Sequence, residues 1–149
     1  MSATRRFGSL IAFVLLSSGI LSYEQSPRFA KPDSKPTESE HIKGPNGLDS
    51  WTLNWPLFDS NDADNPLPFV LVISQNGRAL QRITGHPFIW KWMFWDGGHQ
   101  VAYETGPLHF SMACVLMDIG NGRQVDTIDC WQELPTNAPE WAKALEKQR

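Results

Sequence analysis

The chain lacks a strong excess of charge of either sign. Its 149 residues include 13 Lys and Arg against 16 Asp and Glu, which gives a formal net charge of −3 at pH 7. A protein that binds duplex nucleic acid through its phosphates needs a basic surface, and this composition does not supply one. We therefore expect no nucleic-acid partner.

The sequence also has few motifs with a defined chemistry. Ser111 has no Gly-x-Ser-x-Gly context, so the turn that exposes a hydrolase nucleophile is not indicated. The sequence has no glycine-rich phosphate loop, and its four histidines match no dedicated zinc spacing. We expect no catalytic activity, no cofactor and no metal.

Long hydrophobic runs are missing apart from one near the N-terminus. Residues 10–21 are apolar except for two serines and a glycine, and they follow Arg5 and Arg6. A basic start before such a stretch is typical of an export signal, whereas a bilayer-spanning helix needs about 20 residues. We predict a signal peptide over residues 1–22 and a periplasmic or extracellular protein. The alternatives are an uncleaved anchor, which would be the only link to a membrane, and a buried core helix.

Cysteine is scarce, with only Cys114 and Cys130 in the chain. Export permits a disulfide between them. A two-residue hairpin turn at Asn121 and Gly122 would place Ala113 opposite Cys130 and direct the two thiols to opposite faces. Direct opposition needs a longer turn or a bulge. A disulfide and two small buried side chains are both compatible with the sequence.

Residues 23–50 contain four prolines among Ser, Lys, Glu and Gly, with no periodic apolar pattern. Such a segment buries too little surface to offset the entropy lost on ordering. We predict a disordered tether over residues 23–50 and a folded domain over residues 51–149. The domain is expected to begin where Trp51, Leu53 and Trp55 alternate with polar residues.

An internal repeat is the most informative feature that the chain does have. Residues 70–83 return as residues 115–128, about 45 residues later, with Asn-Gly-Arg in register. Each copy is an apolar β-rich run, a turn favoured by Asn-Gly and a second β-leaning run. The length suits a four-stranded propeller blade, although the chain is too short to close a ring of blades.

The strongest strand signal lies at residues 88–95, and the turn Asp96-Gly97-Gly98-His99 leads into the alternating run 100–105. A two-residue turn at Gly97-Gly98 pairs Phe94 with Val101, Trp92 with Tyr103 and Lys91 with Glu104. One face of this hairpin then carries six apolar or aromatic side chains: Phe88, Trp90, Trp92, Phe94, Val101 and Tyr103. Another segment or another molecule must cover that face, because leaving it in water costs about 25 cal/mol per Å².

Residues 69–128 resemble about one and a half repeats of the TolB-like (WD40-like) β-propeller family. Phe94-Trp95-Asp96-Gly97 stands at that family's aromatic-led turn, Val101-Ala102-Tyr103 at its short strand and Val115-Leu116-Met117-Asp118 at its third strand. The Ser-Pro of the family's turn is missing, and Trp95 replaces a small residue. The resemblance implies a blade-like sheet and a binding or scaffolding role in the cell envelope without catalysis.

These patterns predict an all-β fold, an antiparallel β-meander that resembles a propeller blade with an extra hairpin and a short C-terminal helix. The helix is indicated within residues 134–147, with Thr136 or Asn137 as its cap, Pro139 and Glu140 in its first turn, and Trp141 and Leu145 one turn apart. Because so short a helix is marginal alone, its apolar side should dock on the sheet.

The expected function is an exported, non-enzymatic binding or scaffolding module of the cell envelope that acts through the aromatic sheet face or a sheet edge. Its partner would be a protein, another envelope component or a second copy of the chain. The alternative is a small carbohydrate-binding or hydrolytic secreted protein. The candidate binding residues are two tryptophans and a His/Glu group: Trp95, Trp131, His99, Glu104 and His109.

Overall fold

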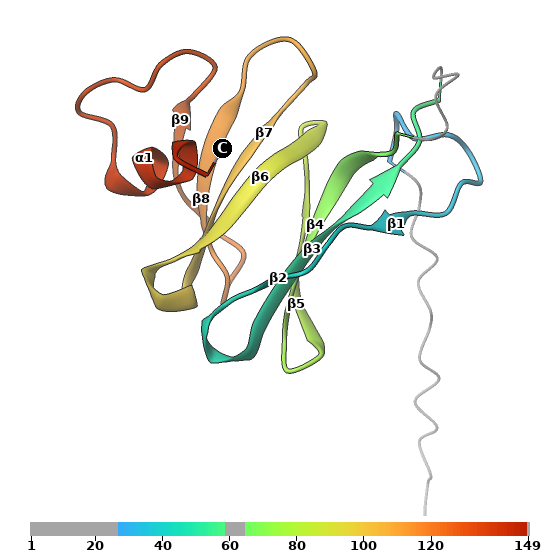
Figure 1. Cartoon of the computed structure of the whole chain (residues 1–149), viewed down its shortest axis with the longest axis horizontal. Helices are drawn as coiled ribbons and strands as arrows, with labels where there is room; N and C mark the ends of the chain where they lie inside the picture. Colours follow the sequence, from blue (N-terminus) through green and yellow to red (C-terminus); the bar gives the residue numbers. More distant parts are fainter. Residues whose placement is uncertain (1–26, 59–64, 149) are drawn as a thin grey trace, which may run out of the picture.

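The computed structural model describes residues 27–58 and 65–148. Within them, nine strands form two antiparallel sheets that pack face to face, and one helix covers the outer face of the second sheet (Figure 1). The all-β prediction is confirmed. The predicted signal peptide over residues 1–22 lies outside the described residues. Across residues 27–58 and 65–148, no helix is long and apolar enough to span a bilayer.

The first sheet has five strands, and its centre is a long antiparallel pair that the N-terminal strands extend on one side. In chain order the strands are β1 (Thr37–Glu38), β2 (Ile42–Lys43), β3 (Leu48–Trp55), β4 (Leu67–Gln75) and β5 (Arg78–Thr84). Asn76 and Gly77 form the two-residue turn between β4 and β5, and both have positive φ. This is the hairpin that the first copy of the repeat predicts.

The first sheet corrects the predicted domain boundary. β3 begins at Leu48 rather than Trp51, and Leu48 is buried between the sheets. The disordered tether predicted over residues 23–50 is also wrong in part, since β1 and β2 both pair with β3. These strands are two residues each and gain their backbone hydrogen bonds from a partner strand. Hydrophobic periodicity cannot reveal so short an element.

The second sheet has four strands in sequential order: β6 (Phe88–Trp95), β7 (Gln100–Gly106), β8 (Ala113–Asp118) and β9 (Gln124–Asp129). The predicted register of β6 and β7 is confirmed, with Phe94 opposite Val101, Trp92 opposite Tyr103 and Lys91 opposite Glu104. The turn between them runs from Asp96 to His99. Sequential antiparallel order occurs in many meanders, so this topology leaves the TolB-like resemblance a prediction.

The aromatic face of the β6–β7 hairpin lies in the core. Trp92, Phe94, Val101 and Tyr103 pack with side chains of the first sheet and of β8, among them Leu48, Leu71, Ile73, Ile83 and Val115. A register shift between Ile89 and Lys91 divides the predicted six-residue face. As a result, Phe88 and Trp90 pack in a separate cluster with Trp55 and Phe69. The first sheet of the same chain therefore covers the aromatic face of the hairpin, which the sequence showed must be covered.

The C-terminal helix α1 (Glu140–Glu146) docks on the opposite face of the second sheet, as predicted (Figure 1). Trp141 and Leu145 are buried there against Met93 and Leu116. The Trp141 indole N–H donates a 3.1 Å hydrogen bond to a carboxylate oxygen of Asp126 on β9. The helix therefore gives this face a second hydrophobic core.

Candidate functional site

The predicted His/Glu group does not converge on one site. His99 lies in the β6–β7 turn, Glu104 lies on β7 and His109 lies in the β7–β8 connection. Each of the three lines a different hollow of the surface. The arrangement provides no shared cleft in which these side chains could act on one substrate.

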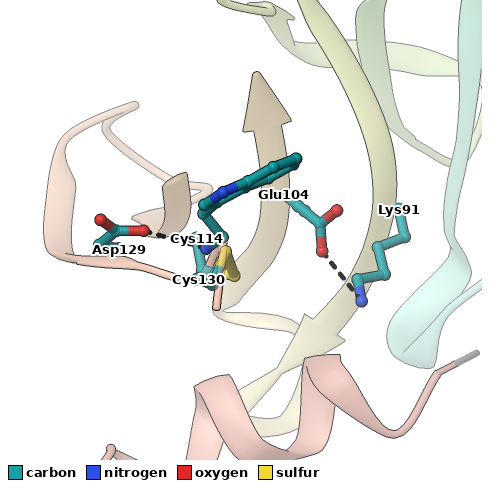
Figure 2. Close-up of a disulfide and its surroundings, with 6 residues drawn as sticks. Lys91, Glu104, Cys114, Asp129 and Cys130 are labelled. Carbon is teal, nitrogen blue, oxygen red and sulfur yellow. Dashed lines mark hydrogen bonds and ion pairs between the residues drawn. A yellow bond between two sulfur atoms is a disulfide. The ribbon is translucent and has the colours of Figure 1, made fainter. Parts of the chain in front are cut away.

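Glu104 is held in an ion pair beside the disulfide (Figure 2). One of its carboxylate oxygens lies 2.9 Å from Nζ of Lys91, and the two side chains are 18% and 22% exposed. The Glu104 carboxylate and the sulfurs of Cys114 and Cys130 lie within 4.8 Å of one another, the spacing of a metal site. Because the two sulfurs are bonded to each other, neither supplies a thiolate ligand.

Cys114 and Cys130 form the disulfide that the sequence left open, with their Cα atoms 5.7 Å apart. Residues 119–123, not a two-residue turn, connect β8 to β9, and the register shifts between Leu116 and Met117. Cys114 therefore pairs with Ile128, and Cys130 is its diagonal neighbour on the same face. The expected opposition of Ala113 and Cys130 is wrong, because a shift of one residue exchanges the faces of a strand.

The two candidate tryptophans lie at opposite ends of the second sheet. Trp95 ends β6 and packs, half-buried, in the cluster beneath the helix. Trp131 follows the far end of β9, where it is 47% exposed and its backbone N–H donates to a carboxylate oxygen of Asp129. They do not form a common aromatic platform.

A more pronounced feature is an apolar groove at the end of the two sheets where β6 begins and β7 ends. Its larger hollow, of about 390 Å³, is lined by Phe29, Leu57, Pro87, Phe88, Pro107, Leu108, His109 and Phe110. A neighbouring hollow of about 260 Å³ shares Phe29 and Leu57 and adds Arg28 and Phe58. We refer to the two hollows together as the apolar groove.

Backbone hydrogen bonds hold the N-terminal side of the groove in place. Ala30 forms a β-bridge with Leu57, and the Phe58 N–H donates to the Phe29 carbonyl at 3.0 Å. These contacts fix Phe29 beside the end of β3. Phe29 falls within the predicted tether, so no sequence pattern marked it as a binding residue.

The other side of the groove comes from two connections between strands. The His86 N–H donates to the Thr105 hydroxyl at 2.7 Å, and that hydroxyl donates to the Phe88 carbonyl at 2.8 Å. These bonds join the start of β6 to the end of β7. The β7–β8 connection then leaves Leu108 45% and Phe110 69% exposed, so they do not bury themselves against the sheet.

The surface of the groove is apolar and nearly uncharged. Phe29 is 52% exposed and Phe58 is 62% exposed, next to the exposed Leu108 and Phe110. Among the described residues that line it, none carries a carboxylate, and the ionisable groups are Arg28 and His109. An exposed apolar cluster of this kind marks an interaction site more often than a surface without a partner.

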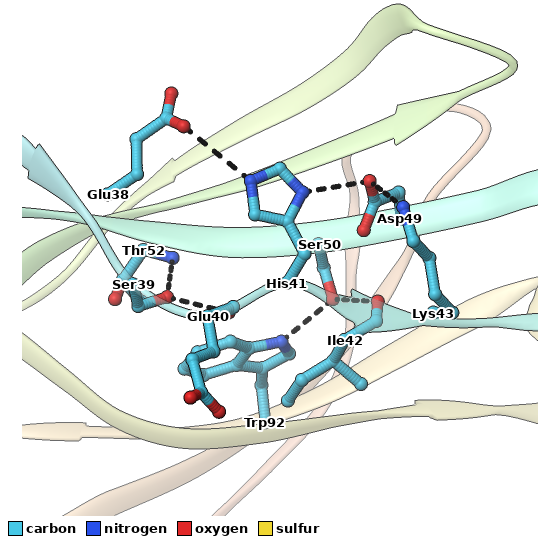
Figure 3. A network of polar contacts seen from close by, with 10 residues as sticks. All are labelled: Glu38, Ser39, Glu40, His41, Ile42, Lys43, Asp49, Ser50, Thr52 and Trp92. Atoms are coloured by element: carbon cyan, nitrogen blue, oxygen red, sulfur yellow. Dashed lines mark hydrogen bonds and ion pairs between the residues drawn. The ribbon is translucent and has the colours of Figure 1, made fainter.

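A separate polar network joins β2 to β3 on the first sheet (Figure 3). The His41 ring stacks on Trp51 with centroids 4.4 Å apart, and its Nδ1 lies 2.9 Å from a carboxylate oxygen of Asp49. Lys43 donates to the same oxygen at 2.6 Å. The hydrogen bond to Asp49 raises the pKa of His41, and the bonds from His41 and Lys43 lower the pKa of Asp49. This network joins the N-terminal strands, and its residues line neither the apolar groove nor the hollows of His99 and Glu104.

Comparison of the chain with protein-family models, with curated proteins and with solved structures gave no match. The geometry of the groove is therefore the basis for assigning a function.

Proposed function

We propose that this chain is an exported, non-enzymatic binding or scaffolding module of the cell envelope, and that it binds its partner through the apolar groove. The observation that carries the proposal is the exposure of Phe29, Phe58, Leu108 and Phe110 along the two adjoining hollows of the apolar groove. The aromatic face of the β6–β7 hairpin is interior, so the groove takes the place of that face as the binding surface.

The chemistry of the groove favours binding over catalysis. General acid–base catalysis needs groups that donate and accept protons at the reacting atoms. Among the described residues that line the larger hollow, His109 is the only one with a polar side chain. Its ring lies edge-on to Phe110 with centroids 6.4 Å apart, and none of the described residues that line the hollow with it is acidic.

The envelope setting rests on two further observations. The apolar run at residues 10–21 follows two arginines, as in export signals. The Cys114–Cys130 disulfide suits an oxidising compartment. The TolB-like resemblance of residues 69–128 points to the same role by analogy.

Binding of an apolar fluorescent probe, N-phenyl-1-naphthylamine, would test the groove. We expect the protein to enhance the probe's fluorescence and the double variant Leu108→Ser with Phe110→Ser to lose most of that signal. Val125→Ser is the matched control, because Val125 is 52% exposed on β9 and does not line the groove. Equal signals from the double variant and the parent protein would refute the groove as a binding surface.

A photo-crosslinking residue at position 110 would test for an envelope partner. Irradiation of intact cells should give a crosslinked product from this site and none from the same residue at position 125. Crosslinks of equal yield at both positions would show that the partner does not bind preferentially at the groove.

The alternative of carbohydrate binding keeps one observation in its favour, the exposure of Trp131. Aromatic rings of this kind stack on the apolar faces of sugars. A glycan array with the parent protein and Trp131→Ala separates the two functions. A glycan signal lost in Trp131→Ala but kept in Leu108→Ser would support the alternative over the groove.

A further inference from the structure

We infer that the apolar groove docks on the surface of a lipid bilayer, beside the point where residues 10–21 enter it. The inference rests on the proposed function of the groove, and it applies to the form of the protein that retains residues 10–21. It identifies the partner as a lipid surface rather than another protein.

The groove lies at one end of the fold, where strands of both sheets begin or end. β3 and β7 end at the groove, and β6 and β8 begin there, so four segments distant in sequence gather at one end of the two sheets (Figure 1). The described chain starts at Pro27 at this same end, since Phe29 lines both hollows.

Only a short length of chain separates the groove from the apolar run at residues 10–21. The run ends at Leu21, and residues 22–26 separate it from Pro27. An extended chain spans at most about 3.6 Å per residue, so this connection reaches about 20 Å. If residues 10–21 are inserted in a bilayer, the groove end of the domain must therefore stay close to the surface of that bilayer.

The two ends of the domain differ in their surface chemistry. The groove end exposes three phenylalanines and a leucine, with Arg28 as its cation and no carboxylate among the described lining residues. The opposite end is formed by exposed polar turns, including Asn76-Gly77 and Asn121-Gly122. Lipid-facing surfaces combine apolar side chains with basic residues in this way.

The lining of the groove also favours lipid over a specific ligand. Sites for defined small molecules or peptides place a few polar groups where they fix the orientation of the ligand. In the larger hollow, His109 is the one polar side chain among the described residues that line it. A fluid surface of acyl chains needs no such orientation.

The test uses the full chain in vesicles of phosphatidylcholine. Both native cysteines are in the disulfide, so a Phe110→Cys variant carries a single reactive thiol for an environment-sensitive fluorophore. Some vesicles include phosphatidylcholine with a nitroxide quencher high on its acyl chain. Asn121→Cys, in the exposed turn at the opposite end, is the matched control.

We expect the fluorophore at position 110 to be quenched several-fold more strongly than the fluorophore at position 121. Equally weak quenching at both positions, in protein that floats with the vesicles, would overturn the inference. If the groove still bound N-phenyl-1-naphthylamine in that case, its binding function would stand and its partner would be a protein. Loss of probe binding as well would overturn the proposed function too.

Discussion

The indole N–H of Trp92 on β6 donates a 2.9 Å hydrogen bond to the hydroxyl of Ser50 on β3, and this bond joins the two sheets across the core. Ser50 is fully buried, and its hydroxyl also donates to the Ile42 carbonyl at 3.2 Å (Figure 3). One side chain thus connects β2, β3 and β6. A buried hydroxyl in this position is stable because both of its hydrogen-bonding roles are used.

Ser50→Ala should lower the free energy of unfolding by about 1–3 kcal/mol, since it leaves the Trp92 indole N–H without its acceptor. Urea unfolding measures the change. In a Trp92→Phe background the same substitution should cost less, because the donor is already absent. Equal losses in the two backgrounds would show that the bond contributes nothing.

Removing the disulfide should destabilise the protein by about 3 kcal/mol, the value for a closed loop of roughly 15 residues, since Cys114 and Cys130 are 16 residues apart. Denaturant midpoints with and without a reductant measure this loss. The double variant Cys114→Ala with Cys130→Ala should show the lower midpoint and no response to the reductant. A response in that variant would assign the effect to something other than the disulfide.

Leu145→Ala should cost about 2–5 kcal/mol, because Leu145 is fully buried between α1 and the second sheet. Thermal or urea unfolding measures the change, and Lys147→Ala at the exposed end of the helix is the control. A loss as small as that of the control would mean that the helix is not docked in solution.

The imidazole of His41 should titrate above its ordinary pKa of 6.5, because its hydrogen bond to Asp49 favours the protonated ring. NMR titration of the ring measures this pKa, and Asp49→Asn should lower it toward the ordinary value. Glu38→Gln should have a smaller effect, because the Glu38 carboxylate oxygen lies 3.6 Å from Nε2 of the ring, whereas the Asp49 oxygen lies 2.9 Å from Nδ1. An unchanged pKa in Asp49→Asn would contradict the assignment.

The sign of the effect on stability follows from the direction of each shift. The raised pKa of His41 means that its contribution is fully present below pH 6.5 and is lost as the pH rises through the folded-state pKa. The lowered pKa of Asp49 means that its contribution is present above its ordinary 3.8 and is lost as the pH falls through the folded-state value. Urea midpoints across these two ranges measure both effects, with Asp49→Asn as the reference.

The local sequence pattern was sufficient to predict the strand pairing of the β6–β7 hairpin. Its register was predictable because side-chain alternation and the Asp-Gly-Gly turn constrain each other, and Lys91 opposite Glu104 agreed with both. The same reasoning failed for Cys114 and Cys130. A turn of different length and a bulge in one ladder change the face of a residue, and neither is visible in the periodicity.

The groove could not be predicted from the sequence, for a different reason. Leu108, His109 and Phe110 lie in a connection whose length could suggest binding, and His109 was a candidate residue. Phe29 gave no signal, because nothing in a proline-rich segment shows that it will pair with the chain that follows a distant strand.

The sequence by itself determined the main strands within residues 69–128, the C-terminal helix and its apolar side, because these depend on alternation, turn residues and helical spacing among near neighbours. Only the tertiary structure decided which surface covers the aromatic hairpin and which apolar side chains remain exposed. Those outcomes depend on how two complete sheets pack, and packing is settled by contacts between residues far apart in the chain.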